Sequence, residues 1–133
     1  MILLDTHAAL WFTLDSGSLG KRSRRMAHQA ALDGQLTISA VSFWEMALLI
    51  TKRRLRPPAS AQEMRQQILS AGTTELPLTG EIAILAGELH GLHADPADRF
   101  IAATAIMHDA MLVTADNRLL QWRHGMRRHD AEK

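Results

Sequence analysis

The chain has 133 residues, of which 47% are hydrophobic, and its 15 Lys and Arg nearly balance its 14 Asp and Glu. This length and composition predict one folded globular domain spanning residues 1–133, and the near-neutral charge leaves nucleic-acid binding to local patches. The absence of cysteine excludes disulfides and thiolate metal sites. The N-terminal segment lacks the features of a signal peptide, and no apolar run approaches the roughly 18 residues of a membrane span, so we expect a soluble, cytoplasmic protein without a membrane partner.

Hydrophobic periodicity predicts short strands that alternate with helices. In chain order, we expect a strand at 2–4, a helix at 7–14, a helix at 20–32, a strand at 36–39, a helix at 42–53, a helix at 60–71, a strand at 74–76, a helix at 79–89, a helix at 97–110, a strand at 111–114 and a helix at 117–122. Gly34 and Pro57-Pro58 end the helices that precede them. The polar tail, about 123–133, encodes a final edge strand only weakly. This alternation implies right-handed crossovers and therefore an α/β sandwich around a mainly parallel sheet.

Four acidic residues, Asp5, Glu45, Asp98 and Asp116, adjoin or interrupt apolar segments. Asp5 and Asp116 follow predicted strands, and the other two lie in the first turns of apolar helices. A lone buried carboxylate costs several kcal/mol unless it is paired, protonated or metal-bound. Because the carboxyl ends of parallel strands border one crevice, the four acids predict a shared pocket with a shared cation.

Three of these acids also have a local structural interpretation. Asp5 could cap the helix that follows it, and Asp116 could be a turn or cap residue. Glu45 could complete a Ser-x-x-Glu capping box with Ser42, although Glu45 shares the apolar helix face of Leu48. The argument for a common site is therefore collective.

Two neighbouring acids receive different interpretations. Asp95 precedes Pro96, as a helix N-cap precedes a proline at the first helical position. Asp98 lies three residues later, on the helix face that carries Ile101 and Ala105. A carboxylate at the head of this small, apolar face is explained most simply by a cation.

Carboxylates gathered in one pocket favour a particular chemistry. Mg²⁺ and Mn²⁺ prefer carboxylate and water oxygens, and such an ion polarises a phosphoryl group and lowers the pKa of a bound water. The matching reaction is metal-assisted phosphodiester hydrolysis. Zinc is not favoured because the chain has no His-x-x-x-His motif, and His90 and His93 fall in a predicted loop.

Four segments together resemble the motifs of the PIN-domain nucleases, and most closely the VapC-type toxins of type II toxin–antitoxin modules. These segments are Met1–His7, Ser39–Glu45, His93–Ala103 and Thr114–Asn117, in order and over nearly the whole chain. The resemblance implies a three-layer α/β/α sandwich with a short, mainly parallel central sheet. It also implies a Mg²⁺- or Mn²⁺-dependent endoribonuclease that acts on RNA, is neutralised by a cognate antitoxin, and forms a homodimer.

The resemblance also implies roles for individual residues. Asp5, Glu45, Asp98 and Asp116 would be the catalytic acids, with Asp5 and Asp98 as direct metal ligands, Asp116 close to the metal and Glu45 acting through water. The supporting residues would be Thr6, Ser42, Arg99, Thr114 and Asn117. Arg99 could steady Asp98 or contact phosphate, or it could form a surface salt bridge. The chain departs from the family at its polar segment 125–130, which puts the last strand in doubt.

Basic residues form three groups, within 21–25, 52–56 and 118–128. If one face gathers them around the acids, they would position an RNA backbone. The structural alternative is a set of solvated helix faces.

Two other functions fit part of this pattern. A metal-dependent phosphatase would use Asp5 as a nucleophile, but that chemistry calls for a second Asp two residues later, where this chain has His7. A non-catalytic α/β module could bind RNA or a protein, but it would be expected to lose at least one acid of the set.

Overall fold

The computed structural model describes residues 1–57 and 59–133. Within these ranges, five parallel strands form one sheet in the order β3-β2-β1-β4-β5. The elements are β1 (Ile2–Leu4), α1 (Thr6–Thr13), α2 (Lys21–Leu32), β2 (Leu36–Ser39), α3 (Ala40–Thr51), α4 (Ala61–Ser70), β3 (Thr74–Leu76), α5 (Gly80–Glu88), α6 (Pro96–Met107), β4 (Met111–Thr114), α7 (Asn117–Leu120) and β5 (Arg128–Asp130). None of the helices described is both long and apolar enough to cross a membrane.

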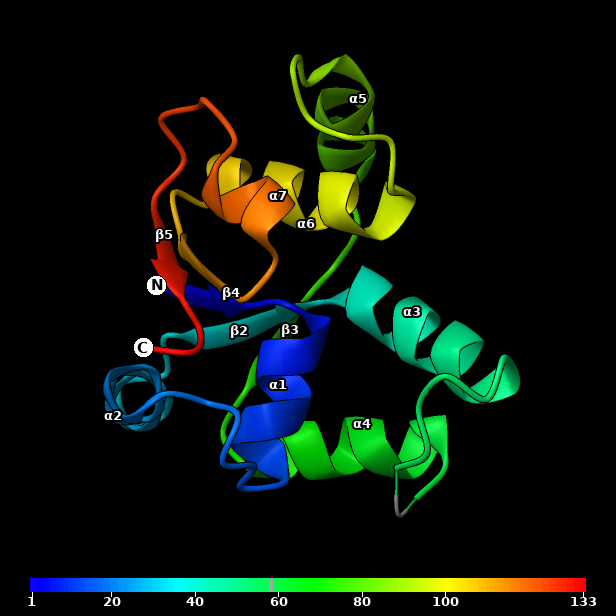
Figure 1. Ribbon diagram of the computed structural model, residues 1–133, viewed down its shortest axis with the longest axis vertical. Coiled ribbons are helices and arrows are strands. Elements are labelled where there is room, and N and C mark those ends of the chain that lie inside the picture. The colour runs from blue at the N-terminus through cyan, green and yellow to red at the C-terminus, as the bar shows by residue number, and fades with distance from the viewer. Residues whose placement is uncertain (58) are drawn as a thin grey trace.

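The sheet separates two hydrophobic cores (Figure 1). Leu3 of the central strand packs into the core beneath α5, α6 and α7, and the next residue, Leu4, packs into the core against α1, α2 and α4. Successive side chains of a strand point to opposite faces, so even this three-residue strand supplies both cores. The arrangement confirms the predicted three-layer α/β/α sandwich with a parallel sheet.

The strand register places one edge of the sheet where the acids are expected. Leu4 of β1 pairs with Ile38 of β2 and with Val113 of β4. The residues that follow these three, Asp5, Ser39 and Thr114, therefore lie side by side at the carboxyl edge of the sheet. Helices α1 and α3 begin directly at this edge.

The start of α3 differs from the prediction. The helix begins at Ala40, and Ser39 caps it by accepting a hydrogen bond from the Val41 N–H at 3.2 Å. The capping box that was the structural alternative for Ser42 and Glu45 does not form, because both residues lie inside the helix. The strand β2 runs straight into the helix, so the cap falls on the last strand residue. The helix ends at Thr51, ahead of the Pro57-Pro58 pair whose second residue lies outside the described ranges.

The polar tail does form a strand, which removes the doubt about this segment. Strand β5 pairs with β4, with Asp130 opposite Thr114. Met126 and Ala131 on either side of it are buried, and the Arg128 guanidinium donates to the backbone oxygens of Leu119 and Trp122. An edge strand exposes one side to water, so its own residues need not be apolar.

Gly20 allows the C-terminal tail to pack closely against the start of α2. Its N–H donates to the Ala131 oxygen at 2.8 Å, and a Cβ at this position would overlap the Lys133 backbone. We expect Gly20→Ala to lower the free energy of unfolding by about 1–3 kcal/mol, measured by urea denaturation. Gly87→Ala is the control, since its Cβ would meet no atom within 4 Å; equal effects of the two changes would contradict this packing role.

Candidate acidic metal site

All four predicted catalytic acids line one hollow of about 370 Å³ at the carboxyl edge of the sheet. Its lining residues are Asp5, His7, Trp11, Glu45, Asp95, Asp98, Ala115, Asp116 and Arg118. They come from α1, α3, α6 and α7 and from the turns that precede these helices. Residues far apart in the sequence thus meet in one concave site.

Asp5 both caps a helix and faces the hollow. One carboxylate oxygen accepts from the Ala8 N–H at 2.8 Å, and the other accepts from the Thr114 hydroxyl at 2.5 Å. The Thr114 hydroxyl oxygen also accepts from the Asp116 N–H at 3.1 Å. Thr114 therefore ties the first acid to the last, and the capping and pocket interpretations of Asp5 both hold. Burial raises the pKa of Asp5, because it penalises the charged carboxylate.

Asp95 is the helix cap that the sequence predicts, and Asp98 lies in the first turn of the same helix. Asp95 caps α6, and one of its oxygens accepts from the N–H groups of Ala97 at 3.1 Å and Asp98 at 3.4 Å. Asp98 is 9% exposed, and burial together with the nearby carboxylates of Asp95 and Asp116 raises its pKa to about 8. A carboxyl group in this setting stays protonated near neutral pH unless a cation compensates its charge.

Asp116 caps α7 by accepting from the Arg118 N–H at 2.8 Å. Burial acts to raise the pKa of Asp116, but the hydrogen bonds from Arg118 outweigh it and the pKa is lowered. The pKa values of these two neighbouring acids therefore shift in opposite directions, so that Asp98 favours its protonated form and Asp116 its charged form. The shifts are linked because the two carboxyl groups lie close together in the site.

Glu45 lies on α3 at the border between this hollow and a second, smaller one. The buried Thr6 hydroxyl donates to the Ser42 hydroxyl oxygen at 3.0 Å, which fastens α1 to α3 one turn before Glu45. Thr6 and Ser42 therefore support the wall that carries Glu45. Asn117 is exposed at the start of α7.

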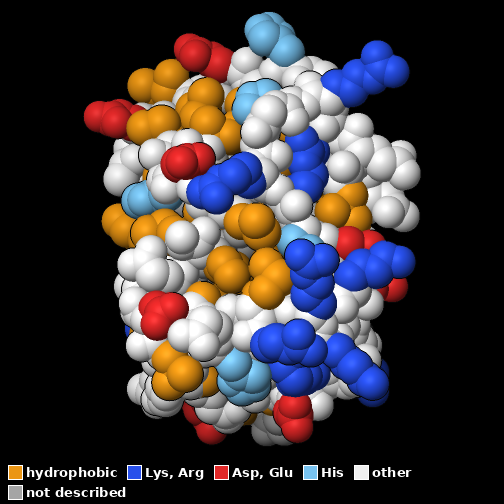
Figure 2. Space-filling view, turned by 90° about the vertical axis from the view of Figure 1, so that its left-hand side faces the viewer, with side chains coloured by type: hydrophobic (Ala, Val, Ile, Leu, Met, Phe, Trp, Pro, Cys, Tyr) orange, Lys and Arg blue, Asp and Glu red, His pale blue; other side chains and the backbone are white. Residues whose placement is uncertain are grey.

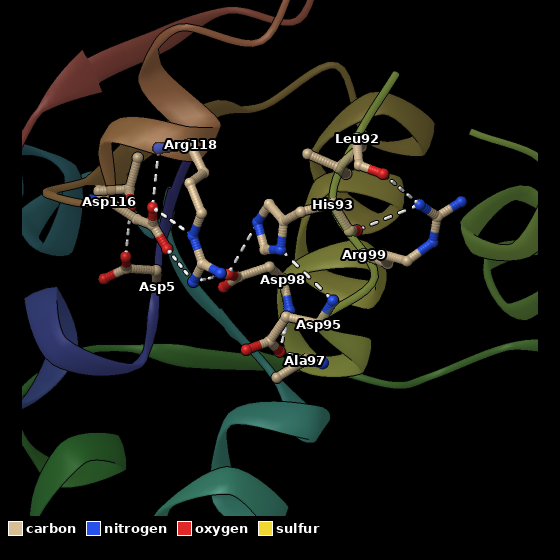
Figure 3. Close-up of polar contacts among 10 residues, drawn as sticks. Asp5, Leu92, His93, Asp95, Ala97, Asp98, Arg99, Asp116 and Arg118 are labelled. Carbon is tan, nitrogen blue, oxygen red and sulfur yellow. Dashed lines mark hydrogen bonds and ion pairs between the residues drawn. The ribbon is translucent and has the colours of Figure 1, made fainter. Parts of the chain in front are cut away.

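Two residues that the sequence analysis did not assign to the site contact Asp98 (Figure 3). His93 Nε2 lies 3.2 Å from Asp98 Oδ2. The Arg118 guanidinium lies across both acids, with Nη2 3.0 Å from Asp116 Oδ2 and 3.5 Å from Asp98 Oδ2. The sequence did hold a signal for Arg118: it lies two residues after Asp116, and a capping Asp accepts from the N–H groups of the next residues, which brings them close to its carboxylate.

The donor atoms fit a hard divalent cation. One ligand atom each of His93, Asp98 and Asp116 lies within 4.8 Å of the others, while Asp5 and Glu45 line the same hollow. His93 Nδ1 accepts from the Asp95 N–H at 3.3 Å, while His93 Nε2 is buried without a hydrogen-bond partner, 3.2 Å from Asp98 Oδ2. The remaining ligand atoms are carboxylate oxygens, which Mg²⁺ and Mn²⁺ prefer.

Arg99 has a different role from those considered for it. Its guanidinium donates to the backbone oxygens of Ala86, near the end of α5, and of Leu89 and Leu92, in the segment that links α5 to α6, at 2.8–2.9 Å. It also reaches the His93 oxygen at 3.2 Å. Arg99 therefore fixes the loop that carries His93, in place of the contact with Asp98, phosphate or a surface acid that was considered.

The basic groups lie in different places. Arg24 pairs with Asp15, and Arg25 lines a hollow with Met1 and Gln35 at the amino ends of the strands. Figure 2 shows the side of the molecule with both chain termini, where Lys and Arg side chains gather over part of the face. The group within 52–56 instead borders the acids, because Lys52 and Arg54 line the smaller hollow that shares Glu45 and Asp95 with the acidic one.

The chain matches the PIN domain family over residues 2–124 and therefore belongs to it. A relative, Ribonuclease VapC22 of Mycobacterium tuberculosis (strain ATCC 25618 / H37Rv), is 33% identical over 124 residues, which cover 92% of each chain. These findings confirm the resemblance carried by the four sequence motifs.

Solved structures share the fold. DNA-bound VapBC from Salmonella typhimurium matches with a TM-score of 0.71 and 20% identity over 98% of both chains. VapBC2 from Rickettsia felis, bound to a DNA fragment from their promoter, matches with a TM-score of 0.65 and 18% identity over 97% of this chain and 98% of the other. At these identities the likeness shows a common architecture.

Proposed function

We propose that this protein is a metal-dependent endoribonuclease toxin of the VapC type, formed by residues 1–133 as one domain and neutralised by a cognate antitoxin. The convergence of Asp5, Glu45, Asp98 and Asp116 on one hollow carries the proposal. A 33% identical relative is a ribonuclease by name. An α/β module that only binds RNA or protein would not need four converging acids, so this alternative is not favoured.

In this proposal the acids have unequal roles. Asp98 and Asp116, with Asp5 beside them, hold Mg²⁺ or Mn²⁺, which when bound polarises the phosphoryl group and lowers the pKa of a water. Glu45 faces the hollow from α3, where its carboxylate would accept a hydrogen bond from a water molecule. Thr114 holds Asp5 in place through its hydroxyl, and the His93 ring lies against Asp98.

The substrate and protein partners use surfaces next to the acids. Lys52 and Arg54 border the acidic hollow and would bind the RNA backbone on its way into the site. A separate, apolar hollow of about 520 Å³ is lined by Trp44 and Leu78, which are 49% and 41% exposed. Exposed apolar surface of this kind suits a protein contact, in keeping with a homodimer or a bound antitoxin segment.

The decisive experiment is RNA cleavage by the purified protein with Mg²⁺ or Mn²⁺. We expect cleavage that EDTA abolishes and that added Mn²⁺ restores, because the acids need an ion to act on phosphate. Gel analysis of a labelled RNA measures it. Activity that persists in EDTA would overturn the metal-dependent proposal, and hydrolysis of a small phosphomonoester without RNA cleavage would point to a phosphatase.

A further inference from the structure

The Arg118 side chain occupies the space between the two acids that an ion would need. Its Nη2 donates to Asp116 Oδ2 at 3.0 Å and to Asp98 Oδ2 at 3.5 Å, and its Nε donates to Asp116 Oδ1 at 3.3 Å. A small divalent ion binds carboxylate oxygens at about 2.0–2.1 Å. Arg118 and an ion ligated by both acids would therefore overlap, and their charges would repel each other.

Arg118 is free to leave this position. Its side chain is 58% exposed, and its helix, α7, has four residues. The contact that fixes the Asp116 cap comes from the Arg118 backbone N–H at 2.8 Å, which stays in place when the side chain turns away. Exposed ion pairs contribute roughly 0–1 kcal/mol each, so an incoming ion can displace the guanidinium.

A displaced Arg118 stays beside the acids, because α7 starts directly after Asp116. The guanidinium then has lost its carboxylate partners and lies at the rim of a site that, under the proposed function, receives an RNA phosphate. Arginine binds phosphate oxygens through paired N–H groups. A positive charge at this point would also stabilise the charge that develops on the phosphate during hydrolysis.

We propose that Arg118 has two alternating partners. In the metal-free protein it takes the place of the cation between Asp98 and Asp116, and in the metal-loaded protein it binds the scissile phosphate of the RNA. This inference rests on the proposed function for its second half, whereas its first half concerns the protein and the ion alone.

The two halves predict opposite effects of one substitution. We expect Arg118→Gln to bind Mn²⁺ about 3- to 10-fold more tightly, because no guanidinium has to be displaced. At saturating Mn²⁺ the same variant should cleave RNA about 10- to 100-fold more slowly, because a phosphate-binding charge is lost. Arg118→Lys should cleave RNA at a rate between those of the wild-type protein and Arg118→Gln, since an ammonium keeps the charge but not the paired N–H groups.

Mn²⁺ binding is measured without RNA, by electron paramagnetic resonance of the free ion, and cleavage is measured separately. Arg65→Gln is the matched control, because Arg65 pairs with Glu75 at a similar exposure of 46%. Mn²⁺ affinity that is unchanged or weaker in Arg118→Gln overturns the first half, and unchanged cleavage at saturating Mn²⁺ overturns the second. If the wild-type protein binds Mn²⁺ but cleaves no RNA, the proposed function fails, and the Mn²⁺ comparison still decides whether Arg118 competes with the ion.

Discussion

We expect that replacing Asp98 by Asn strongly lowers RNA cleavage and at the same time stabilises the metal-free protein. The activity falls about 1,000-fold, because a central ligand of the ion is lost. The free energy of unfolding rises by about 1–2 kcal/mol, because Asn removes a carboxyl group that is buried beside Asp95 and Asp116. Cleavage assays and thermal unfolding of the EDTA-treated protein measure the two effects.

The stabilising effect depends on pH in a defined direction. The pKa of Asp98 is about 8 in the folded protein against an ordinary value of 3.8. Between these values the folded state binds a proton that the unfolded state has released, so the contribution of this group to stability falls as pH rises. The advantage of Asp98→Asn therefore grows from about pH 4 to about pH 8 and then levels off.

Asp109→Asn is the control for Asp98→Asn, since Asp109 is exposed and pairs with Arg127 at the surface. It should leave both cleavage and unfolding unchanged. If Asp98→Asn destabilises the metal-free protein, the buried carboxyl group of Asp98 does not lower the free energy of unfolding as proposed. If that variant still cleaves RNA at the wild-type rate, the site itself is wrongly assigned.

We expect that replacing Arg99 by Ala lowers the free energy of unfolding by about 2–4 kcal/mol. The Arg99 guanidinium donates hydrogen bonds to the backbone oxygens of Ala86, Gly87, Leu89, Leu92 and His93. Without it, partly buried carbonyl groups lose their donors and the segment between α5 and α6 loses its anchor. Urea denaturation measures the loss, and Arg65→Ala, which removes an arginine from an exposed pair with Glu75, should cost far less.

The activity of Arg99→Ala distinguishes a structural role from a catalytic one. At a temperature where the variant is folded, RNA cleavage should stay within a few fold of wild type, because the guanidinium points away from the acids. A variant with normal stability and no cleavage would instead restore the earlier interpretation, in which Arg99 holds Asp98 or phosphate.

The sequence was sufficient where local patterns and sheet topology act together. Asp5 and Asp116 follow apolar strands, and parallel pairing brings strand ends to one edge, so their meeting could be foreseen. Asp98 could be separated from Asp95 because a proline after a capping Asp marks the first turn of a helix. These inferences depend on helix capping and on the geometry of parallel strands, and tertiary contacts seldom override either.

The misses have physical causes as well. A Ser-x-x-Glu pattern fits any helix start, and it could not show that Ser39 caps α3 three residues before Ser42. The partners of Arg99 are backbone oxygens, which leave no side-chain signature in a sequence. Strand β5 is polar because it is an edge strand, so its formation depends on pairing with β4 and not on its own hydrophobicity.

Three acids around the hollow, Asp5, Asp95 and Asp116, are also the residues at which α1, α6 and α7 begin. The hydrogen bonds that cap these helices hold the carboxylates in place in the folded protein. The partial positive charge at a helix N-terminus, roughly half a unit charge for a full helix, offsets part of their repulsion. The acidic pocket is therefore preorganised by the fold, and withdrawing the ion should silence the enzyme without unfolding it.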